Sequence, residues 1–238
     1  MGVDTRMHNV APVVLILGAG PRIGASVAEK FVSNGYEVAV ASRSGTGTKT
    51  AKGFLSLKAD FTMSDSIPAL FDAVKTKCHA APSVVVYNAA TLTPPPHPPP
   101  PRDKDSVLSV SAESVASDLN VNTISPYVAA QQAISGWETL PKETKKTFIY
   151  TGNIMNVSVV PMPLFLNLGI GKSASAFWIG LANASYSAQG FRFFYADERH
   201  GDGKFQGDGA RRRRTWRVLC TVVPWHAMFV NEKGYVQF

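Results

Sequence analysis

The sequence predicts an α/β fold: a doubly wound parallel sheet between two layers of helices, in a three-layer αβα arrangement. Two observations lead to this expectation. Segments typical of strands and of helices alternate along residues 13–195, at the lengths that parallel sheets with crossover helices require. In addition, the strand segments at 13–17 and 83–87 are almost entirely apolar, as expected where helices cover both faces of a sheet.

The size of the chain favours a single domain. Its 238 residues, 45% of them hydrophobic and 17% charged, suffice for one well-buried core and are too few for two domains of ordinary size. We expect one domain over residues 1–198 and an irregular basic segment over residues 199–238. No apolar stretch has the length of a secretion signal or a membrane span, so the sequence predicts neither.

Cysteine usage indicates a reducing compartment. The two cysteines, Cys78 and Cys220, stand far apart and have no neighbours at the spacing of metal ligands. We therefore expect no disulfide framework, no metal site and a cytoplasmic location.

The formal charge of +7 is concentrated near the end of the chain. A run of arginines there is either a nuclear localisation signal or nucleic-acid contact, or a solvated tail. The second interpretation is favoured because no stacking aromatic residues or nucleic-acid module accompany it. The run consists of Arg211, Arg212, Arg213, Arg214 and Arg217.

The first strand-to-helix connection predicts a phosphate-binding turn. The apolar strand at 13–17 runs into Gly18, Gly20 and Gly24, and residues 25–32 follow with the spacing of an amphipathic helix. Gly18 permits a tight turn, Gly20 lets the backbone approach a pyrophosphate, and Gly24 lets the helix pack close to the strand. The helix N-terminus then offers free N–H groups to the anion. The sequence therefore predicts a Rossmann-type dinucleotide-binding domain.

The next elements continue the alternation. Residues 37–42 and 53–59 predict strands joined by a loop rich in Gly and Thr, and Ser64 is placed to cap a helix at 65–77. After the apolar strand at 83–87, residues 94–101 hold seven prolines and one histidine, which predicts an extended, stiff loop.

The second half of the domain follows the same pattern. A long helix is expected from 111 to 137, with a kink at Pro126. Beyond residue 197 glycines and charges dominate, and no further strand-helix unit is predicted. The remaining expected elements are a strand at 147–151, an apolar loop at 154–170, a helix at 171–188 and a strand at 191–195.

The end of the second strand favours NADP over NAD. An NAD enzyme places an acidic residue there to bind both ribose hydroxyls, whereas this chain has Ser42, Arg43 and Ser44. Arg43 would pair with a 2′-phosphate and the two hydroxyls would add hydrogen bonds. Arg22, in the glycine turn, would supply a second cation. The alternative is that Arg43 is an ordinary surface residue.

Over residues 13–198 the order of these pieces resembles the short-chain dehydrogenase/reductase family. The resemblance implies that Asp60 meets the adenine and that Asn88 and Ala89 lie beside the cofactor. It further implies that Asn122 orders a water of the proton relay and that Lys172 binds the nicotinamide ribose. The residues that match the family's glycine signature are Gly18, Gly20, Ile23 and Gly24.

Two positions depart from the family pattern. The family tyrosine stands four residues before the lysine, where its pKa is lowered by the lysine charge, and this chain has Leu168 there. The serine expected after the fifth strand is also missing, since that stretch reads Tyr150, Thr151, Gly152, Asn153.

Several groups are candidate substitutes. Thr151 or Asn153 would polarise a carbonyl, and a water ordered by Lys172 and Asn122 would act as the acid. Tyr150, Tyr186 and Tyr195 are candidate proton donors whose spacing favours core packing instead. His97 is more typical of a loop histidine than of a catalyst.

Two further segments bear on the substrate. The apolar loop that spans residues 157–166 would form a hydrophobic wall near the nicotinamide, and a packing role is an equal alternative. The proline run is either a ligand for an SH3 or WW module or, as favoured, a stiff lid beside the cofactor, because ligands enter such sheets after the fourth strand.

These features predict an NADP-dependent oxidoreductase that moves a hydride between NADPH and a carbonyl or alcohol carbon of a small hydrophobic substrate. The rival hypothesis is a catalytically silent NADP-binding sensor or scaffold protein. The missing tyrosine and serine favour the rival, and Asn122 and Lys172 oppose it. By resemblance the partners are a carbonyl compound and further copies of the chain, without membrane or nucleic acid.

Overall fold

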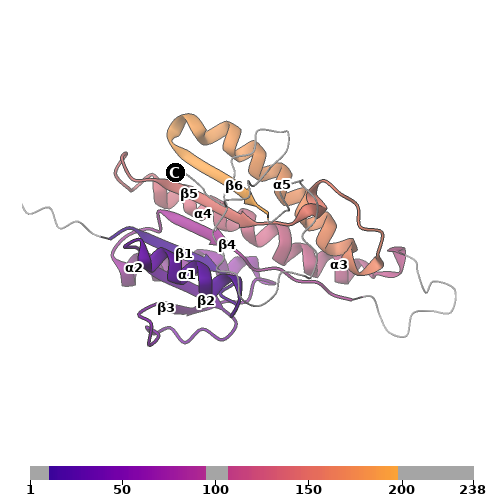
Figure 1. Ribbon diagram of the computed structural model, residues 1–238, viewed down its shortest axis with the longest axis horizontal. Coiled ribbons are helices and arrows are strands. Elements are labelled where there is room, and N and C mark those ends of the chain that lie inside the picture. Colours follow the sequence, from indigo (N-terminus) through magenta and orange to yellow (C-terminus); the bar gives the residue numbers. More distant parts are fainter. Residues whose placement is uncertain (1–10, 95–106, 198–238) are drawn as a thin grey trace, which may run out of the picture.

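The computed structural model describes residues 11–94 and 107–197 (Figure 1). Six strands form one parallel sheet in the order β3-β2-β1-β4-β5-β6. The strand order reverses between β1 and β4, and in sheets of this kind ligands bind outside the carboxyl ends of the strands at such a point. The strands are β1 (Val13–Leu17), β2 (Glu37–Ser42), β3 (Leu55–Lys58), β4 (Val84–Tyr87), β5 (Lys146–Thr151) and β6 (Phe191–Ala196).

Helices cover both faces of the sheet, so the predicted three-layer αβα fold is confirmed (Figure 1). Successive side chains of a strand point to opposite faces. Thus Val14 and Ile16 pack with α1, while Leu15 and Leu17 pack in the core shared with α2, α4 and α5. The helices are α1 (Ile23–Ser33), α2 (Ile67–Cys78), α3 (Ala112–Leu119), α4 (Ser125–Trp137) and α5 (Leu166–Tyr186).

The helix expected at 111–137 is divided, which corrects the prediction of a kink at Pro126. A π-helical turn, Asn120–Ile124, separates α3 from α4. Pro126 lies in the first turn of α4, where its missing N–H leaves no hydrogen bond unmade. Ser111 caps α3, because its hydroxyl accepts the backbone N–H of Ser114 at 3.2 Å.

Two other boundaries differ from the sequence-based expectation. Ser64 opens a short 3-10 turn, Ser64–Ser66, and its side chain does not cap α2. Helix α5 begins at Leu166, five residues before the expected start, so Leu168 lies in its first turn. Glycines and a proline in this apolar stretch gave it the appearance of a loop.

By length and composition, the stretch 163–189 is apolar enough to cross a membrane. In the structure this stretch contains α5, which packs against β6. The Asn183 side chain accepts the backbone N–H of Phe193 at 3.2 Å, and Lys172 and Ser175 are buried on the inner side of the helix. Helix α5 thus lies on the sheet, with only part of this apolar stretch buried.

Several predictions fall outside the described residues. They concern most of the proline run with His97, the second cysteine, the arginine run and the basic segment at 199–238. Cys78 is described, and it is a buried free thiol in α2. Burial raises its pKa to about 11, so the thiol is inert at neutral pH.

Candidate functional site

The glycine turn after β1 forms an open cradle. Gly18 has φ +98°, and a Cβ built there would lie 2.3 Å from the backbone nitrogen of Ala89. A Cβ on Gly24 would lie 2.6 Å from the Cα of Ala19, whereas one on Gly20 would meet no atom within 4 Å. No side chain caps the N-terminus of α1. The turn therefore leaves space beside Gly20 and a helix dipole directed into it, which fits a pyrophosphate.

Asn88 joins the ends of three neighbouring strands. Its amide nitrogen donates to the carbonyl oxygen of Gly18 at 2.7 Å, after β1, and its amide oxygen lies 3.1 Å from the hydroxyl of Thr151, at the end of β5. Asn88 itself follows β4, and the N–H of Ala89 donates to Leu17. The predicted cofactor residues 88 and 89 thus lie beside Gly18, where β1, β4 and β5 end.

The residues predicted to select the cofactor gather where β2 and β3 end. The hydroxyls of Ser42 and Ser44 lie 3.3 Å apart, with the exposed Arg43 between them in the chain. The Asp60 carboxylate accepts the N–H and the hydroxyl of Thr62 at 3.0 and 2.8 Å. These hydrogen bonds, aided by the Arg43 charge, hold the pKa of Asp60 below its ordinary value. Asp60 and Arg43 therefore lie close enough for their charges to interact, where β2 and β3 end.

Asn122 lies fully buried in the π-helical turn, a type of helix defect common at functional sites. Its side-chain amide forms two hydrogen bonds with the backbone of Thr91, at 3.1 and 3.0 Å. Its backbone carbonyl accepts the hydroxyls of Tyr150 and Ser175, each at 2.8 Å. The side chain thus holds the loop after β4, and the carbonyl already has two donors.

Lys172 is buried in the second turn of α5. Its Nζ donates to the carbonyl oxygen of Thr151 at 2.8 Å and lies 4.4 Å from the centroid of the Tyr150 ring. Gly171 permits this approach, since a Cβ there would be 2.5 Å from the Cβ of Asn122. Burial lowers the pKa of Lys172 to about 7, against the opposing charge of Asp197. The structure therefore holds a buried amine whose charged form is disfavoured relative to a lysine in water.

Thr151 and Asn153 differ in what they still offer a substrate. The Thr151 hydroxyl lies within hydrogen-bond distance of Tyr87 and Asn88 and is used inside the sheet. The Asn153 side-chain oxygen accepts the N–H of Met155 at 3.0 Å. Its amide nitrogen has no hydrogen-bond partner in residues 11–94 and 107–197, so it remains a donor for a carbonyl oxygen.

The three tyrosines considered as proton donors are engaged elsewhere. Burial raises the pKa of Tyr150, whose hydroxyl points to Asn122. Tyr186 stacks in the core on Phe191 at 6.3 Å. The Tyr195 hydroxyl donates to the carbonyl of Asn153 at 2.8 Å, and its ring fills the space where a side chain on Gly152 would lie.

A buried carboxylate next to Asn122 was not predicted from the sequence. Asp118, which is 1% exposed, accepts the N–H and hydroxyl of Thr93 at 3.0 and 2.7 Å and the amide of Asn167 at 3.0 Å. Burial opposes its ionisation, but the hydrogen bonds outweigh that effect and lower its pKa. Its signal was the spacing of four residues from Asn122, which places both side chains on one helical face.

An apolar cavity of about 540 Å³ lies between the loop after β5 and the start of α5. It meets the site through Met155, in the short turn that follows Asn153. The wall predicted from residues 157–166 is therefore part of a cavity. It is lined by Val107, Met155, Ser158, Val159, Val160, Pro161, Met162, Phe165, Leu166, Gly169, Ile170 and Ser173.

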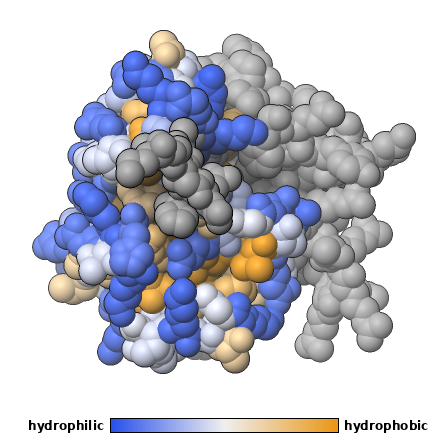
Figure 2. All heavy atoms as spheres, turned by 90° about the vertical axis from the view of Figure 1, so that its left-hand side faces the viewer, coloured by the Kyte–Doolittle hydropathy of each residue, from blue (hydrophilic) through white to orange (hydrophobic). Residues whose placement is uncertain are grey.

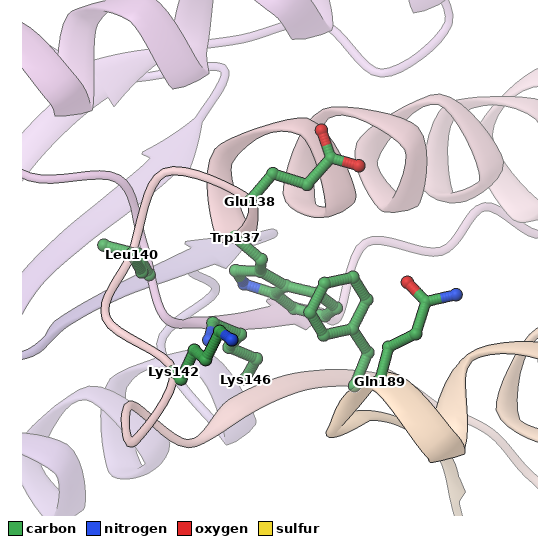
Figure 3. Close-up of a pocket in the computed structure, with 7 residues that line it drawn as sticks. Trp137, Glu138, Leu140, Lys142, Lys146 and Gln189 are labelled. Carbon is green, nitrogen blue, oxygen red and sulfur yellow. The ribbon is translucent and has the colours of Figure 1, made fainter.

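A second hollow, of about 270 Å³, lies beside the amino ends of β5 and β6, away from the glycine cradle. Lys142 and Lys146 lie near each other on one side of Trp137, and Gln189 lies on the other (Figure 3). Because nucleotides bind at carboxyl ends of such sheets, this hollow is not the candidate site.

Figure 2 looks onto the left-hand side of Figure 1, where hydrophilic residues surround a smaller hydrophobic area.

Within the described ranges, no group of three or more His, Cys, Asp or Glu residues is arranged to hold a metal ion.

Comparison with known proteins agrees with this geometry. A model of the short chain dehydrogenase family matches residues 12–161. The chain is 36% identical over 238 residues to the short chain dehydrogenase/reductase dmxR12 of Cryptosporiopsis sp. (strain 8999), covering 96% of this chain and 95% of that protein. The alignment thus extends into the segment 199–238.

Solved structures share the fold. A short-chain type dehydrogenase/reductase from Mycobacterium marinum superposes with a TM-score of 0.64 at 18% identity, over 77% of this chain and 71% of that one. A 4-hydroxyisoleucine dehydrogenase complexed with NADH gives a TM-score of 0.62 at 15% identity, over 76% of this chain and 72% of that one.

Proposed function

Because the chain belongs to the short-chain dehydrogenase/reductase family, we propose that it is an NADP-dependent oxidoreductase acting on a small hydrophobic carbonyl compound or the matching alcohol. The open face of Gly20 beside the uncapped N-terminus of α1 is the observation that carries this proposal. A backbone that leaves this space suits a pyrophosphate. The bound nicotinamide supplies or accepts the hydride.

The chain's own residues divide the remaining tasks. Gly18, Gly24, Ile23 and Arg22 shape and charge the phosphate cradle, and Asp60 meets the adenine. Lys172, with its Nζ fixed on Thr151 at the end of β5, reaches the ribose of the nicotinamide. Asn122 holds the loop after β4 beside it, and Asn153 offers its free amide nitrogen to the carbonyl oxygen.

The direct test is NADPH binding by a variant that fills the cradle. Gly20→Ala places a methyl group in space that is empty of protein atoms, so the fold should persist while NADPH affinity falls about tenfold, equivalent to ~1.4 kcal/mol. Gly169→Ala, where a Cβ also meets no atom within 4 Å, is the matched control for NADPH binding only, because Gly169 lines the apolar cavity. NADPH fluorescence measures binding, and its decay with hydrophobic aldehydes or ketones measures turnover.

Each outcome has a distinct meaning. Binding that is lost in Gly20→Ala alone, with decay only when carbonyls are present, supports the oxidoreductase. Stable fluorescence with every carbonyl would instead support the sensor or scaffold hypothesis. Equal affinity of the two variants would refute the cradle.

The preference for NADP rests on Ser42, Arg43 and Ser44. The similar 4-hydroxyisoleucine dehydrogenase is complexed with NADH, so the choice depends on this chain's own residues. Arg43 is exposed at the end of β2, free to form a charge-assisted pair with a 2′-phosphate.

Arg43→Ala should weaken NADPH binding by about 10- to 100-fold, as expected for loss of a hydrogen bond between charged groups. NADH affinity should stay within about twofold, because NADH has no 2′-phosphate. Lys30→Ala removes an exposed cation from the last turn of α1 and serves as the control. Equal losses for both cofactors would assign Arg43 no role in selection.

The substrate class is inferred from the apolar cavity beside the site. Its lining is almost wholly aliphatic or aromatic, with Ser158 and Ser173 as its hydroxyl groups, and apolar surface favours apolar ligands. Affinity should rise with chain length across a series of aliphatic ketones. A homo-oligomer and a cytoplasmic location stay predictions, and family members often form oligomers.

A further inference from the structure

We propose that the Lys172 ammonium itself gives the proton to the substrate oxygen, in place of a tyrosine. This inference rests on the proposed function. When the carbonyl carbon accepts a hydride, the electron pair of the C=O π bond moves onto oxygen. That oxygen takes a proton from Nζ of Lys172, an O–H bond forms, and a neutral amine remains. Solvent then returns the proton to the amine through the crevice.

The position that normally supplies the acid cannot do so here. Leu168 stands one helical turn before Lys172, and its side chain holds no exchangeable proton. Tyr150 lies directly below the lysine, 4.4 Å from ring centroid to Nζ. Its hydroxyl, however, donates to Asn122 on the inner side of the sheet. The aromatic ring faces the lysine, so Tyr150 supports the cation and does not pass on a proton.

The relay through Asn122 is also closed. A carbonyl oxygen has two lone pairs, and those of Asn122 receive the hydroxyls of Tyr150 and Ser175 at 2.8 Å each. Ser175 is fully buried on α5, so this pair of bonds lies inside the protein. A water on this carbonyl would have to displace a buried hydroxyl and leave it unpaired, at a cost of about 1–3 kcal/mol. The proton path therefore ends at Lys172.

The surroundings of Nζ leave donors for this task. An ammonium group has three donors. One donates to Thr151, which within the described residues is the hydrogen-bond acceptor on Nζ, so two N–H groups are left for the ribose and the substrate oxygen. The charged group that acts on it is Asp197, after β6, and Tyr150 on β5 is the titratable group that faces it.

The environment also suits a proton donor. Burial lowers the pKa of Lys172 to about 7 even with Asp197 nearby, and an acid is most effective when its pKa lies near the working pH. Because the protonated form is the donor, the rate of carbonyl reduction should fall as the pH rises through the pKa.

Two measurements test the inference. The first is the pH titration of the Lys172 13Cε resonance in the protein without cofactor, assigned by its loss in Lys172→Met. A midpoint near neutral pH supports the inference, and one above about 9.5 overturns it, because such an amine holds its proton too strongly.

The second measurement separates proton transfer from ribose binding. Lys172→Arg keeps a cation and hydrogen-bond donors but does not release a proton. NADPH affinity should stay within about threefold, whereas the reduction rate should fall at least about 100-fold and lose its fall with rising pH. A variant that retains more than a tenth of the rate with the same pH profile would overturn the inference.

Lys146→Met is the matched control. Lys146, on β5, is buried like Lys172. Its Nζ likewise donates to a backbone carbonyl, that of Pro141, at 2.8 Å. It likewise lies over an aromatic ring, that of Phe191, at 5.9 Å. It stands at the amino end of β5, near Lys142 and Trp137 (Figure 3), whereas Thr151, the partner of Lys172, stands at the carboxyl end. Its loss should leave the pH profile unchanged. Absence of NADPH binding by the natural protein would overturn the proposed function, and this inference with it.

Discussion

At Gly152 the absence of a side chain decides what its neighbour does. The Tyr195 ring occupies the space in which a Cβ on Gly152 would lie, 2.0 Å from the ring carbon Cε1. Its hydroxyl then binds the backbone of Asn153, accepting the N–H and donating to the carbonyl. A serine at position 152 is therefore excluded by packing, and Tyr195 fixes the turn that carries the Asn153 amide.

A serine at position 152 should destabilise the protein. Gly152→Ser overpacks this site, and the free energy of unfolding should drop by about 1–3 kcal/mol. Tyr195→Ala removes the ring and allows a double-mutant cycle. The stability loss of the double variant should be smaller than the sum of the two single losses by about 0.5–3 kcal/mol. Urea denaturation measures both. Additive losses would show that the two residues do not share this space.

Leu168 offers the complementary change. It lies on α5 four residues before Lys172 and is partly buried. Leu168→Tyr places a phenol on the helix face of the lysine, whose charge lowers the phenol pKa. Carbonyl reduction should rise by about tenfold or more in Leu168→Tyr and should not rise in Leu168→Phe, which adds the ring without the hydroxyl. NADPH consumption by the folded variants is the readout, and equal rates would contradict the alignment of the two residues.

At the scale of elements, the break between α3 and α4 organises one side of the crevice. Two side chains one helical turn apart hold the loop after β4: Asn122 binds Thr91, and Asp118 binds Thr93. Asn167 ties the same carboxylate to the first turn of α5. One short helix and one π-helical turn thus fix both the loop and the helix that carries Lys172.

The Asp118 carboxylate should make part of the stability depend on pH. Its folded-state pKa is lowered by the bonds from Thr93 and Asn167 despite burial, so its stabilisation is present above the ordinary pKa of about 3.9. It is lost as the pH falls through the folded-state value. At neutral pH Asp118→Asn should lower the free energy of unfolding by about 1–3 kcal/mol.

The difference in the free energy of unfolding between Asp118→Asn and the natural protein should narrow from about pH 5 to about pH 3. Protonation of Asp118 in the natural protein weakens the hydrogen bonds that its carboxylate accepts. Asp72→Asn, on the exposed side of α2, is the control and should change stability by less than about 0.5 kcal/mol. Urea unfolding at several pH values decides the matter. A constant difference would mean that Asp118 is not ionised in the folded protein.

At the scale of the whole molecule, α4 and α5 keep large apolar residues on their outer sides. Tyr127 on α4 is 47% exposed, and Ile170 and Leu181 on α5 are 41% and 56% exposed. Burial of such surface between subunits is favourable, in agreement with the expected homo-oligomer.

Leu181→Arg should therefore shift the protein toward a smaller species in size-exclusion chromatography with light scattering. A charge buried in an apolar interface is costly unless it is paired. Val32→Arg, at a 45% exposed apolar position on α1, should leave the molecular mass unchanged. The same mass for both variants would place any interface away from α5.

The sequence by itself determined the sheet, the parallel direction of its strands and the glycine cradle. The reason is local, because apolar strands such as Val13–Leu17 and the spacing of Gly18, Gly20 and Gly24 act through short-range backbone geometry. Only the tertiary structure decided the roles of Lys172, Asn122 and Asp118. Their partners lie 21 to 53 residues away in the chain. The local sequence therefore does not predict that the Asn122 carbonyl accepts two hydroxyls or that the Lys172 amine is buried. Burial and long-range hydrogen bonds, which set both, arise when the helices close over the sheet.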